Sequence, residues 1–187
     1  MTVGIVVTVH ATDATNILRC IAAQTRLPDA VAVLYSDTSA PPMPDWDIPT
    51  TFWRRPNLSD WGHQKRDEGW RLLDTDFVAF FNADDSYKPE YLERMLRDAY
   101  PSTGFIYCNW GERSYSGSAC EPRLGSSTAG NFIVARSVLE SAKGWEGRFY
   151  EADGRNIERY VNHSYATHRT VTYVNDFLYA HNLLWEG

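Results

Sequence analysis

Two adjacent carboxylates, Asp84 and Asp85, stand directly after a short apolar run, Phe77–Phe81, and Asn82. An apolar run of this length that ends in a turn cluster predicts a strand buried on both faces. Open α/β sheets bind ligands at the carboxyl ends of such strands, which is where the two acids would lie. Neighbouring carboxylates repel each other, and a hard divalent cation relieves that repulsion. An isolated Asp-Asp pair is also an ordinary polar turn and helix cap, so the assignment depends on the rest of the chain.

The elements before the acid pair predict a parallel arrangement. The runs Val3–Val9 and Ala30–Tyr35 predict buried strands, and the apolar residues of 17–22 predict a helix between them that Thr12 or Asp13 caps. Strand, helix and strand within about 35 residues form a βαβ unit, which requires parallel pairing and a right-handed crossover. We then expect a Pro-rich surface loop over 40–49, a short strand over 50–53, and a helix over 62–73 that carries Lys65 and Arg66 and buries Leu72 and Leu73.

After the acid pair, Pro89 opens a helix, because its missing N–H costs nothing in a first turn. The polar segment 111–125, rich in Gly and Ser, predicts a hairpin at most. The remaining expected elements are strands over 105–110 and 131–135, a short helix capped by Ser137, a helix over 155–165 and an edge strand over 170–179. The fold class is therefore α/β: one domain over 1–187, with a mostly parallel sheet, helices on both faces and a more irregular half after residue 110.

The composition limits the class of protein. At 187 residues, with 43% hydrophobic and 22% charged residues, the chain suits one globular domain with its own core. The net charge of −6 disfavours a sequence-independent nucleic-acid binder, which needs a basic surface. Three cysteines without metal-like spacing are typical of buried thiols in a reducing compartment. Without a leader sequence or an apolar run of about 20 residues, we expect a cytoplasmic protein with no transmembrane segment.

The first half would bring three polar strand ends together: Thr8–His10, Ser36–Asp37 and Asp84–Asp85, with Arg66 close by. The sequence contains neither the GxGxxG turn of dinucleotide-binding folds nor the GxxxxGK[ST] phosphate loop. Without a glycine cradle, a diphosphate must be held by a metal ion and basic side chains. This combination predicts an activated donor from which a diphosphate departs.

Six segments, in order, resemble motifs of the family 2 glycosyltransferases, which have a GT-A type nucleotide-sugar fold. GIVVTVHATD resembles the first strand and turn, LYSDTS the second strand ending in Asp-Gly-Ser, and GHQKRDEG the segment Gly-x-x-Ala-Arg-Asn-x-Gly. FFNADD resembles the Asp-x-Asp-Asp segment that holds ribose and metal, EAD the acidic segment that supplies the catalytic base, and LYAH the place where a histidine joins the metal shell. Each match is weak alone, and the resemblance rests on the order of all six over nearly the whole chain.

The resemblance implies a role for each matching residue. Thr8, His10 and Asp37 would bind the nucleotide base, Arg66 matches the arginine, and Asp84 would serve the donor and the metal. Asp85 and His181 would complete the metal shell. The implied cofactors are Mn²⁺ or Mg²⁺ and a nucleoside-diphosphate sugar, with a UDP-sugar favoured. From the residues alone, His10, Asp37 and His181 are also compatible with turn and tail positions that bind nothing.

The catalytic base must lie opposite the departing diphosphate, and hence in the second half of the chain. Glu151 and Asp153 there have a family-like position, flanking aromatic residues and a helix start beside them. Asp153 is closer to the expected helix and matches the usual acid better, so we expect it to be the base. The alternative is that both acids only cap the helix.

Three departures from the family pattern stand out. Asn82 replaces the first acid of the metal motif, Asp67 stands where asparagine is usual, and Ala152 separates Glu151 from Asp153. The chain has no Gln-x-x-Arg-Trp segment, which disfavours a processive polysaccharide synthase.

We therefore predict a metal-dependent glycosyltransferase that moves a sugar to an acceptor hydroxyl with inversion. Residues 1–110 would bind the nucleotide-sugar, and residues 111–187 would supply the acceptor and catalytic half. One alternative is a nucleotidyltransferase that makes nucleotide-sugars, although the usual Gly-rich basic loop after the first strand is absent. Another is a non-catalytic nucleotide-sugar-binding module, which Asn82 keeps open. The acceptor is undetermined: a glycan, a lipid-linked glycan, a protein, a small molecule or modified DNA.

Overall fold

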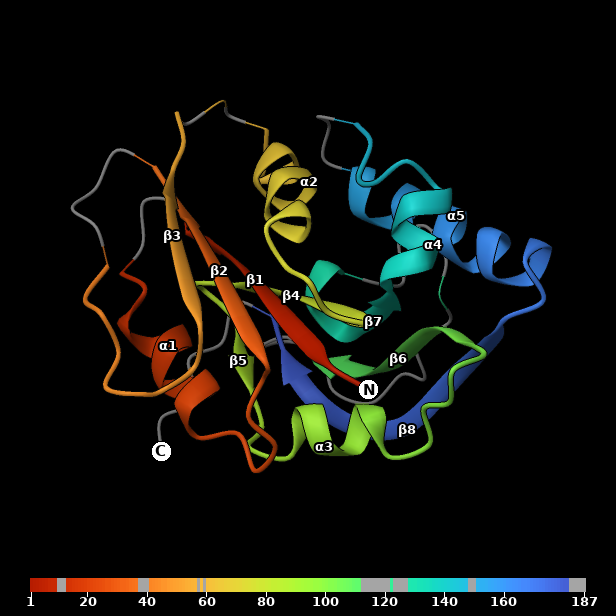
Figure 1. The fold of residues 1–187 in the computed structure, drawn as a ribbon, viewed down its shortest axis with the longest axis horizontal. Coiled ribbons are helices and arrows are strands. Elements are labelled where there is room, and N and C mark those ends of the chain that lie inside the picture. Colours follow the sequence, from red (N-terminus) through yellow and green to blue (C-terminus); the bar gives the residue numbers. More distant parts are fainter. Residues whose placement is uncertain are drawn as a thin grey trace.

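The computed structural model describes residues 1–9, 13–36, 41–56, 58, 60–111, 122, 128–147 and 151–181. These residues form an eight-stranded sheet with helices on both faces (Figure 1). The elements are, in chain order, β1 (Val3–Val9), α1 (Thr15–Ala22), β2 (Ala30–Tyr35), β3 (Thr50–Arg54), α2 (His63–Arg71), β4 (Phe77–Asn82), β5 (Ser86–Tyr87), α3 (Tyr91–Leu96), β6 (Thr103–Gly111), the 3₁₀ turn η1 (Ala129–Asn131), β7 (Phe132–Ala135), α4 (Arg136–Ser141), α5 (Ala152–Ala166) and β8 (Thr170–Ala180).

The strand order is β3-β2-β1-β4-β7-β6-β8-β5. β1 to β4 pair in parallel, β7 runs antiparallel between β4 and β6, and β8 is parallel to β6. Because the chain continues to β2 on one side of β1 and to β4 on the other, the carboxyl ends of β1 and β4 form a topological switch point. The predicted α/β fold, with a mostly parallel sheet between helices, is confirmed.

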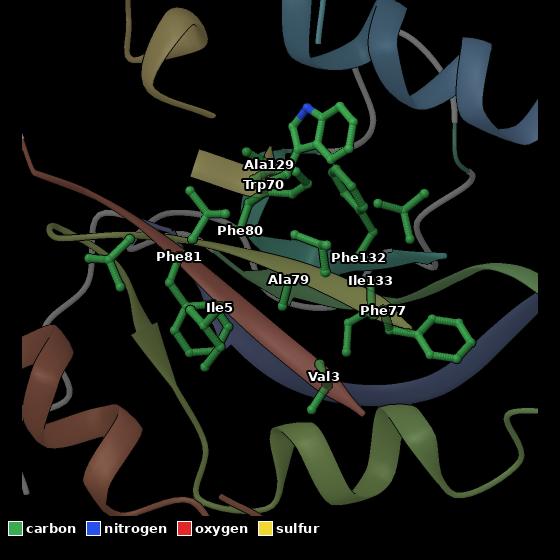
Figure 2. Close-up of a cluster of buried hydrophobic side chains, with 14 of the residues drawn as sticks. Val3, Ile5, Trp70, Phe77, Ala79, Phe80, Phe81, Ala129, Phe132 and Ile133 are labelled. Atoms are coloured by element: carbon green, nitrogen blue, oxygen red, sulfur yellow. The ribbon is translucent and has the colours of Figure 1, made fainter. Parts of the chain in front are cut away.

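The core lies on both faces of the central strands. Every residue of β1 and β4 is buried, because α2, α4 and α5 cover one face while α1 and α3 cover the other (Figure 1). Phe80 and Trp70 lie on the α2 face, and Val3 and Ile5 lie on the opposite face (Figure 2). Helix α2 approaches the sheet so closely that a Cβ on Gly69 would stand 2.4 Å from a methyl group of Val6. Glycine at this position therefore determines how near the residues of α2 come to the strand ends.

Local signals predicted the strands of the first half well, whereas α1 has Ala14 at its N-cap position in place of the expected Thr12 or Asp13. β1 and β2 have the predicted bounds, and β4 differs only by including Asn82. Leu72 was expected to be buried with Leu73, but α2 ends at Arg71, and Leu72 is 37% exposed. The reason is that only one of two consecutive residues at a helix end can face the sheet.

The second half is more regular than its sequence indicates. Helix α5 begins at Ala152 instead of Arg155. Ser137 lies inside α4, whose N-cap position is Ala135 without a side-chain cap, so the predicted cap is wrong. β8 is flanked by β6 and by β5, a short strand that the sequence did not predict. The expected hairpin in 111–125 falls largely outside the described residues.

Two findings bear on the expected compartment without testing it. Among the described cysteines, Cys108 is buried, Cys20 is half-buried, and neither is in a disulfide. In the part of the chain that the structure describes, no helix is both long enough and apolar enough to cross a bilayer.

Candidate active site

Asn82, the last residue of β4, joins three side chains at the switch point. Its Oδ1 accepts hydrogen bonds from the hydroxyl of Thr8 (2.9 Å) and from Nη2 of Arg66 (2.7 Å). Its Nδ2 donates to Oδ2 of Asp85 at 2.6 Å. Because both donors face one end of the amide and a carboxylate faces the other, this network determines the orientation of the amide. Asn82 thus replaces the family's acid with a group that links Arg66 to Asp85.

Asp85 is fully buried, at 0% exposure, and its two oxygens accept from Asn82 in β4, from Tyr179 in β8 and from His181 just after β8. Oδ2 also accepts from the hydroxyl of Tyr179 (2.8 Å), and Oδ1 lies 2.9 Å from Nδ1 of His181. Burial and the charge of Asp85 raise the pKa of Tyr179 well above its ordinary value, so this hydroxyl remains a donor. A carboxylate only accepts, so Nδ1 of His181 carries a proton, and in the neutral imidazole the lone pair is then on Nε2.

Asp84 is exposed and lies within the electrostatic reach of Asp85, His181 and Arg66. Neighbouring protein atoms still remove part of the water around its carboxyl group. This desolvation and the repulsion from Asp85 raise the pKa of Asp84, and His181 and Arg66 oppose that rise. Within the described residues, no three His, Cys, Asp or Glu side chains already surround a common point. The donors nevertheless suit a divalent cation, because such ions take a few carboxylate or imidazole ligands and complete their shell with phosphate oxygens and water.

Arg66 lies in α2 and is only 4% exposed. Its Nη1 donates to the carbonyl of Trp61 (2.9 Å), and its guanidinium lies 5.2 Å from the ring centre of Trp145. The nearest recorded carboxylate oxygen is Oδ1 of Asp153, at 3.8 Å, and Nε has no hydrogen-bond partner among the described residues. A buried guanidinium without a close carboxylate is costly, and an anionic ligand would compensate for it.

Lys65, from the same helix, is also buried and reaches the neighbouring strand ends. Its Nζ donates to the carbonyl of Val9 (2.9 Å) at the end of β1 and to the hydroxyl of Ser36 (2.8 Å) after β2. Helix α2 thus places the ammonium group of Lys65 at the ends of β1 and β2 and the guanidinium group of Arg66 at the ends of β1 and β4. His10 and Asp37, which follow Val9 and Ser36, lie outside the described residues, so their predicted contacts with a base are untested.

Asp153 lies in the first turn of α5, with Oδ1 3.8 Å from Nη1 of Arg66, whose Nη2 bonds Asn82. Its Oδ2 accepts from the backbone N–H of Ala129 (3.2 Å). Its Oδ1 is buried, lies 3.4 Å from Nδ1 of His63, and has no hydrogen-bond partner among the described residues. Glu151 is exposed, immediately precedes α5, and makes no side-chain capping bond. The structure therefore brings Asp153, but not Glu151, into contact with the predicted site.

The sequence interpretation placed Thr8, Arg66, Asp84, Asp85, Asp153 and His181 near one another, and the structure assembles them around the carboxyl ends of β1 and β4. It missed His63, Tyr179 and the indole of Trp145 as parts of the site. The bond between Trp145 and His63 spans 82 positions, and that between Tyr179 and Asp85 spans 94. No local spacing could have revealed such pairs.

Solved structures show the same fold. S. aureus TarS matches with a TM-score of 0.70 and 12% identity over 98% of this chain, which corresponds to 37% of the TarS chain. TarS 1–349 in complex with UDP-GlcNAc matches with a TM-score of 0.69 and 12% identity, over 96% of this chain and 58% of that chain. Glucosyl-3-phosphoglycerate synthase from Mycobacterium tuberculosis, in complex with Mn²⁺, UDP and phosphoglyceric acid, matches with a TM-score of 0.58 and 14% identity, over 96% and 70% of the two chains.

A search among curated protein sequences finds no match. The model of the family described as glycosyl transferase family 2 matches residues 5–172, which is most of the chain and includes all the described site residues except Tyr179 and His181. The assignment that the sequence motifs predicted is confirmed: this chain belongs to glycosyl transferase family 2.

Proposed function

We propose that the chain transfers a sugar from a UDP-sugar to an acceptor hydroxyl, with inversion and with the help of Mn²⁺ or Mg²⁺. The observation that carries this proposal is the position of Arg66 between two acidic groups. Its Nη2 bonds Asn82, which holds Asp85, and its Nη1 lies 3.8 Å from Asp153. A donor bound over Arg66 would have the metal-binding acids on one side and a base on the other. The UDP and UDP-GlcNAc complexes of the structural neighbours support a uridine nucleotide.

Asp84 and His181 are the residues that would hold the cation directly. Asp85 has its oxygens bonded to Asn82, Tyr179 and His181, so we assign it to orient the imidazole with Nε2 directed to the ion. A bound divalent cation would neutralise charge on the departing diphosphate. The Mn²⁺ in the mycobacterial neighbour supports this proposal.

Asp153 is proposed to accept the proton of the acceptor hydroxyl at Oδ1 as that hydroxyl attacks the anomeric carbon. Its Oδ2 is held by the N–H of Ala129, which orients the carboxylate, and the N-terminus of α5 favours a negative charge there. The new bond forms on the face of the sugar opposite the bond to the diphosphate, so the configuration inverts. In this proposal residues 1–110 bind the donor, with Thr8, His10 and Asp37 towards the base, and residues 111–187 supply the base and the acceptor site.

The products formed from a donor panel test the proposal. UDP-glucose, UDP-GlcNAc and other nucleotide-sugars are incubated with Mn²⁺ and an acceptor mixture, and UTP with a sugar 1-phosphate is tested in parallel. Release of UDP that stops in Asp153→Asn supports glycosyl transfer. Release of pyrophosphate supports nucleotidyl transfer, and donor binding without any product supports a binding module; either result would contradict the proposal. Binding itself is readily seen, because a ligand at 100 times its Kd stabilises a protein by about 2.7 kcal/mol.

A further inference from the structure

Nδ1 of His63 is enclosed by three groups from different parts of the chain. Nε1 of Trp145 lies 3.0 Å away, Nη1 of Arg66 lies 3.3 Å away, and Oδ1 of Asp153 lies 3.4 Å away. His63 is 2% exposed and Trp145 is 5% exposed, so bulk water does not compete for these contacts. His63 follows directly on the turn into α2, and nothing in the proposed reaction so far uses it.

The chemistry of these neighbours determines where the imidazole carries its proton. An indole N–H and a guanidinium N–H can only donate, so Nδ1 must accept and must hold a lone pair. The ring proton therefore sits on Nε2, and the ring is neutral. A second proton on Nδ1 would point at two donors and would place a positive charge 3.3 Å from Arg66.

A neutral His63 explains the state of Asp153. An unprotonated Nδ1 cannot donate to Oδ1 of Asp153, and that oxygen is buried without a hydrogen bond among the described residues. If His63 were an imidazolium with its proton on Nδ1, it would form a charge-assisted bond with the same oxygen and would reduce its capacity to take a proton.

We propose that Trp145, acting through His63, is a positioning residue that keeps Oδ1 of Asp153 available as the proton acceptor. This inference rests on the proposed function, because it needs Asp153 as the base. Beyond the role of Asp153, we infer that His63 is neutral and that this state depends on the indole N–H of Trp145.

The turn before α5 is built to place this indole. Oδ1 of Asp67 accepts the backbone N–H of Trp145 at 2.8 Å. Gly144 has a φ of +81°, and a Cβ there would stand 2.2 Å from the same oxygen, so only glycine fits. The ring of Phe80 packs against the indole with 5.0 Å between centres. Asp67, a departure from the family pattern, thus holds the residue that controls His63.

Two charged groups of the described residues lie against His63: Arg66, from its own helix, and Asp153, from α5. The segment after α4 contributes the neutral indole of Trp145, and β4 contributes Phe80 behind that indole. Arg66 opposes protonation of the ring and Asp153 favours it. Because these two effects act from similar distances, the hydrogen bond from the indole to Nδ1 keeps the ring neutral.

The first test observes His63 directly, in the protein without ligands. In ¹⁵N-histidine-labelled protein, two-bond ¹H–¹⁵N spectra distinguish the two neutral tautomers from the imidazolium, and His63→Asn identifies the signal. We expect the Nε2–H tautomer in the wild type at pH 6 to 8. In Trp145→Phe the imidazolium fraction near pH 6 should rise by about two- to tenfold, the equivalent of one hydrogen bond. Trp46→Phe, which removes an indole N–H that bonds Thr50 at the start of β3, should leave the spectrum unchanged.

The second test measures how UDP release depends on pH. In Trp145→Phe we expect kcat to fall by about two- to tenfold near pH 6 and by less near pH 8. The double variant Trp145→Phe/His63→Asn should regain the activity near pH 6, because asparagine cannot be protonated. An imidazolium or an Nδ1–H tautomer in the wild type would overturn the proposal even if Trp145→Phe does not fold. Unchanged protonation of His63 in folded Trp145→Phe would overturn it as well. If the spectra behave as expected but Asp153→Asn stays active, the base assignment fails while the tautomer assignment stands.

Discussion

Oδ1 of Asp85 lies 2.9 Å from Nδ1 of His181, although 96 positions separate the two residues in the chain. The antiparallel pairing of β5 with the end of β8, with Ser86 opposite Ala180, creates this contact. Tyr179 adds its hydroxyl bond to the other oxygen of Asp85. The two-residue strand β5 therefore brings Asp84 and Asp85 close to His181, the histidine that the sequence motifs place near a metal ion.

The role of Asp85 as an orienting group predicts a graded effect on metal binding. In Asp85→Asn, the amide can present a donor to Nδ1 of His181, so the ring can adopt the tautomer that directs N–H towards the ion. Loss of such outer-shell partners costs about 10- to 100-fold in metal affinity. Calorimetric titration of Mn²⁺ in the presence of UDP measures it, and Asp98→Asn, an exposed acid after α3, is the control. Unchanged Mn²⁺ affinity together with an unchanged His181 tautomer would contradict the assignment.

Replacement of Asn82 by the family's usual acid should destabilise this protein. In Asn82→Asp a carboxylate oxygen would face Oδ2 of Asp85 at the 2.6 Å that now separates a donor from an acceptor. We expect a loss of about 1–3 kcal/mol in the free energy of unfolding at pH 7, with Arg66 limiting the loss. Protonation of either of these two carboxyl groups relieves the repulsion, so the deficit should shrink as the pH falls. Urea unfolding at pH 7 and pH 4.5 measures both, with Thr8→Val as a control that removes only an uncharged partner. A deficit that is equal at both pH values would exclude charge repulsion as its cause.

The base assignment predicts opposite results for the two acids at the start of α5. Asp153→Asn is nearly isosteric and should reduce kcat by at least about 100-fold, because the amide cannot take the proton of the acceptor. Its affinity for UDP should remain. Glu151→Gln is the matched control, since Glu151 is exposed and makes no capping bond, and it should keep its activity. An active Asp153→Asn with an inactive Glu151→Gln would reverse the roles.

The ionised carboxylate of Asp84 should destabilise the folded protein when no metal ion is bound. Partial burial and the charge of Asp85 raise the pKa of Asp84 in the folded state, so ionisation of this group disfavours folding. The penalty is therefore present at pH 7 and disappears as the pH falls below the ordinary value of 3.8, where the carboxyl group is protonated in both states. Asp84→Asn should be more stable than the wild type at pH 7 by up to about 1 kcal/mol, given the exposure of the residue.

Thermal unfolding without metal at pH 7 and pH 3 compares the two proteins. With Mn²⁺ and UDP the order should reverse, because only the wild type gains the ligand's stabilisation. A less stable Asp84→Asn at pH 7 without metal would show that the carboxylate has a structural role.

The sequence by itself determined the buried strands and the position of the acid pair. Val3–Val9 and Ala30–Tyr35 have the predicted bounds because strands covered on both faces are continuous apolar runs, which need no information from distant residues. Asp84 and Asp85 were placed correctly at a strand end for the same reason. The order of six weak motifs then indicated the family, which the family model confirms.

Only the tertiary structure decided which groups the candidate residues contact. The antiparallel pairing of β7 with β4 positions the preceding turn η1, whose Ala129 N–H bonds Asp153. The short strand β5 brings His181 to Asp85. The bond from Trp145 to His63 depends on the packing of the segment after α4 against α2. Hydrophobic periodicity determines which face of an element is buried, but it does not specify the strand neighbours or helix contacts that bring distant side chains within hydrogen-bond distance.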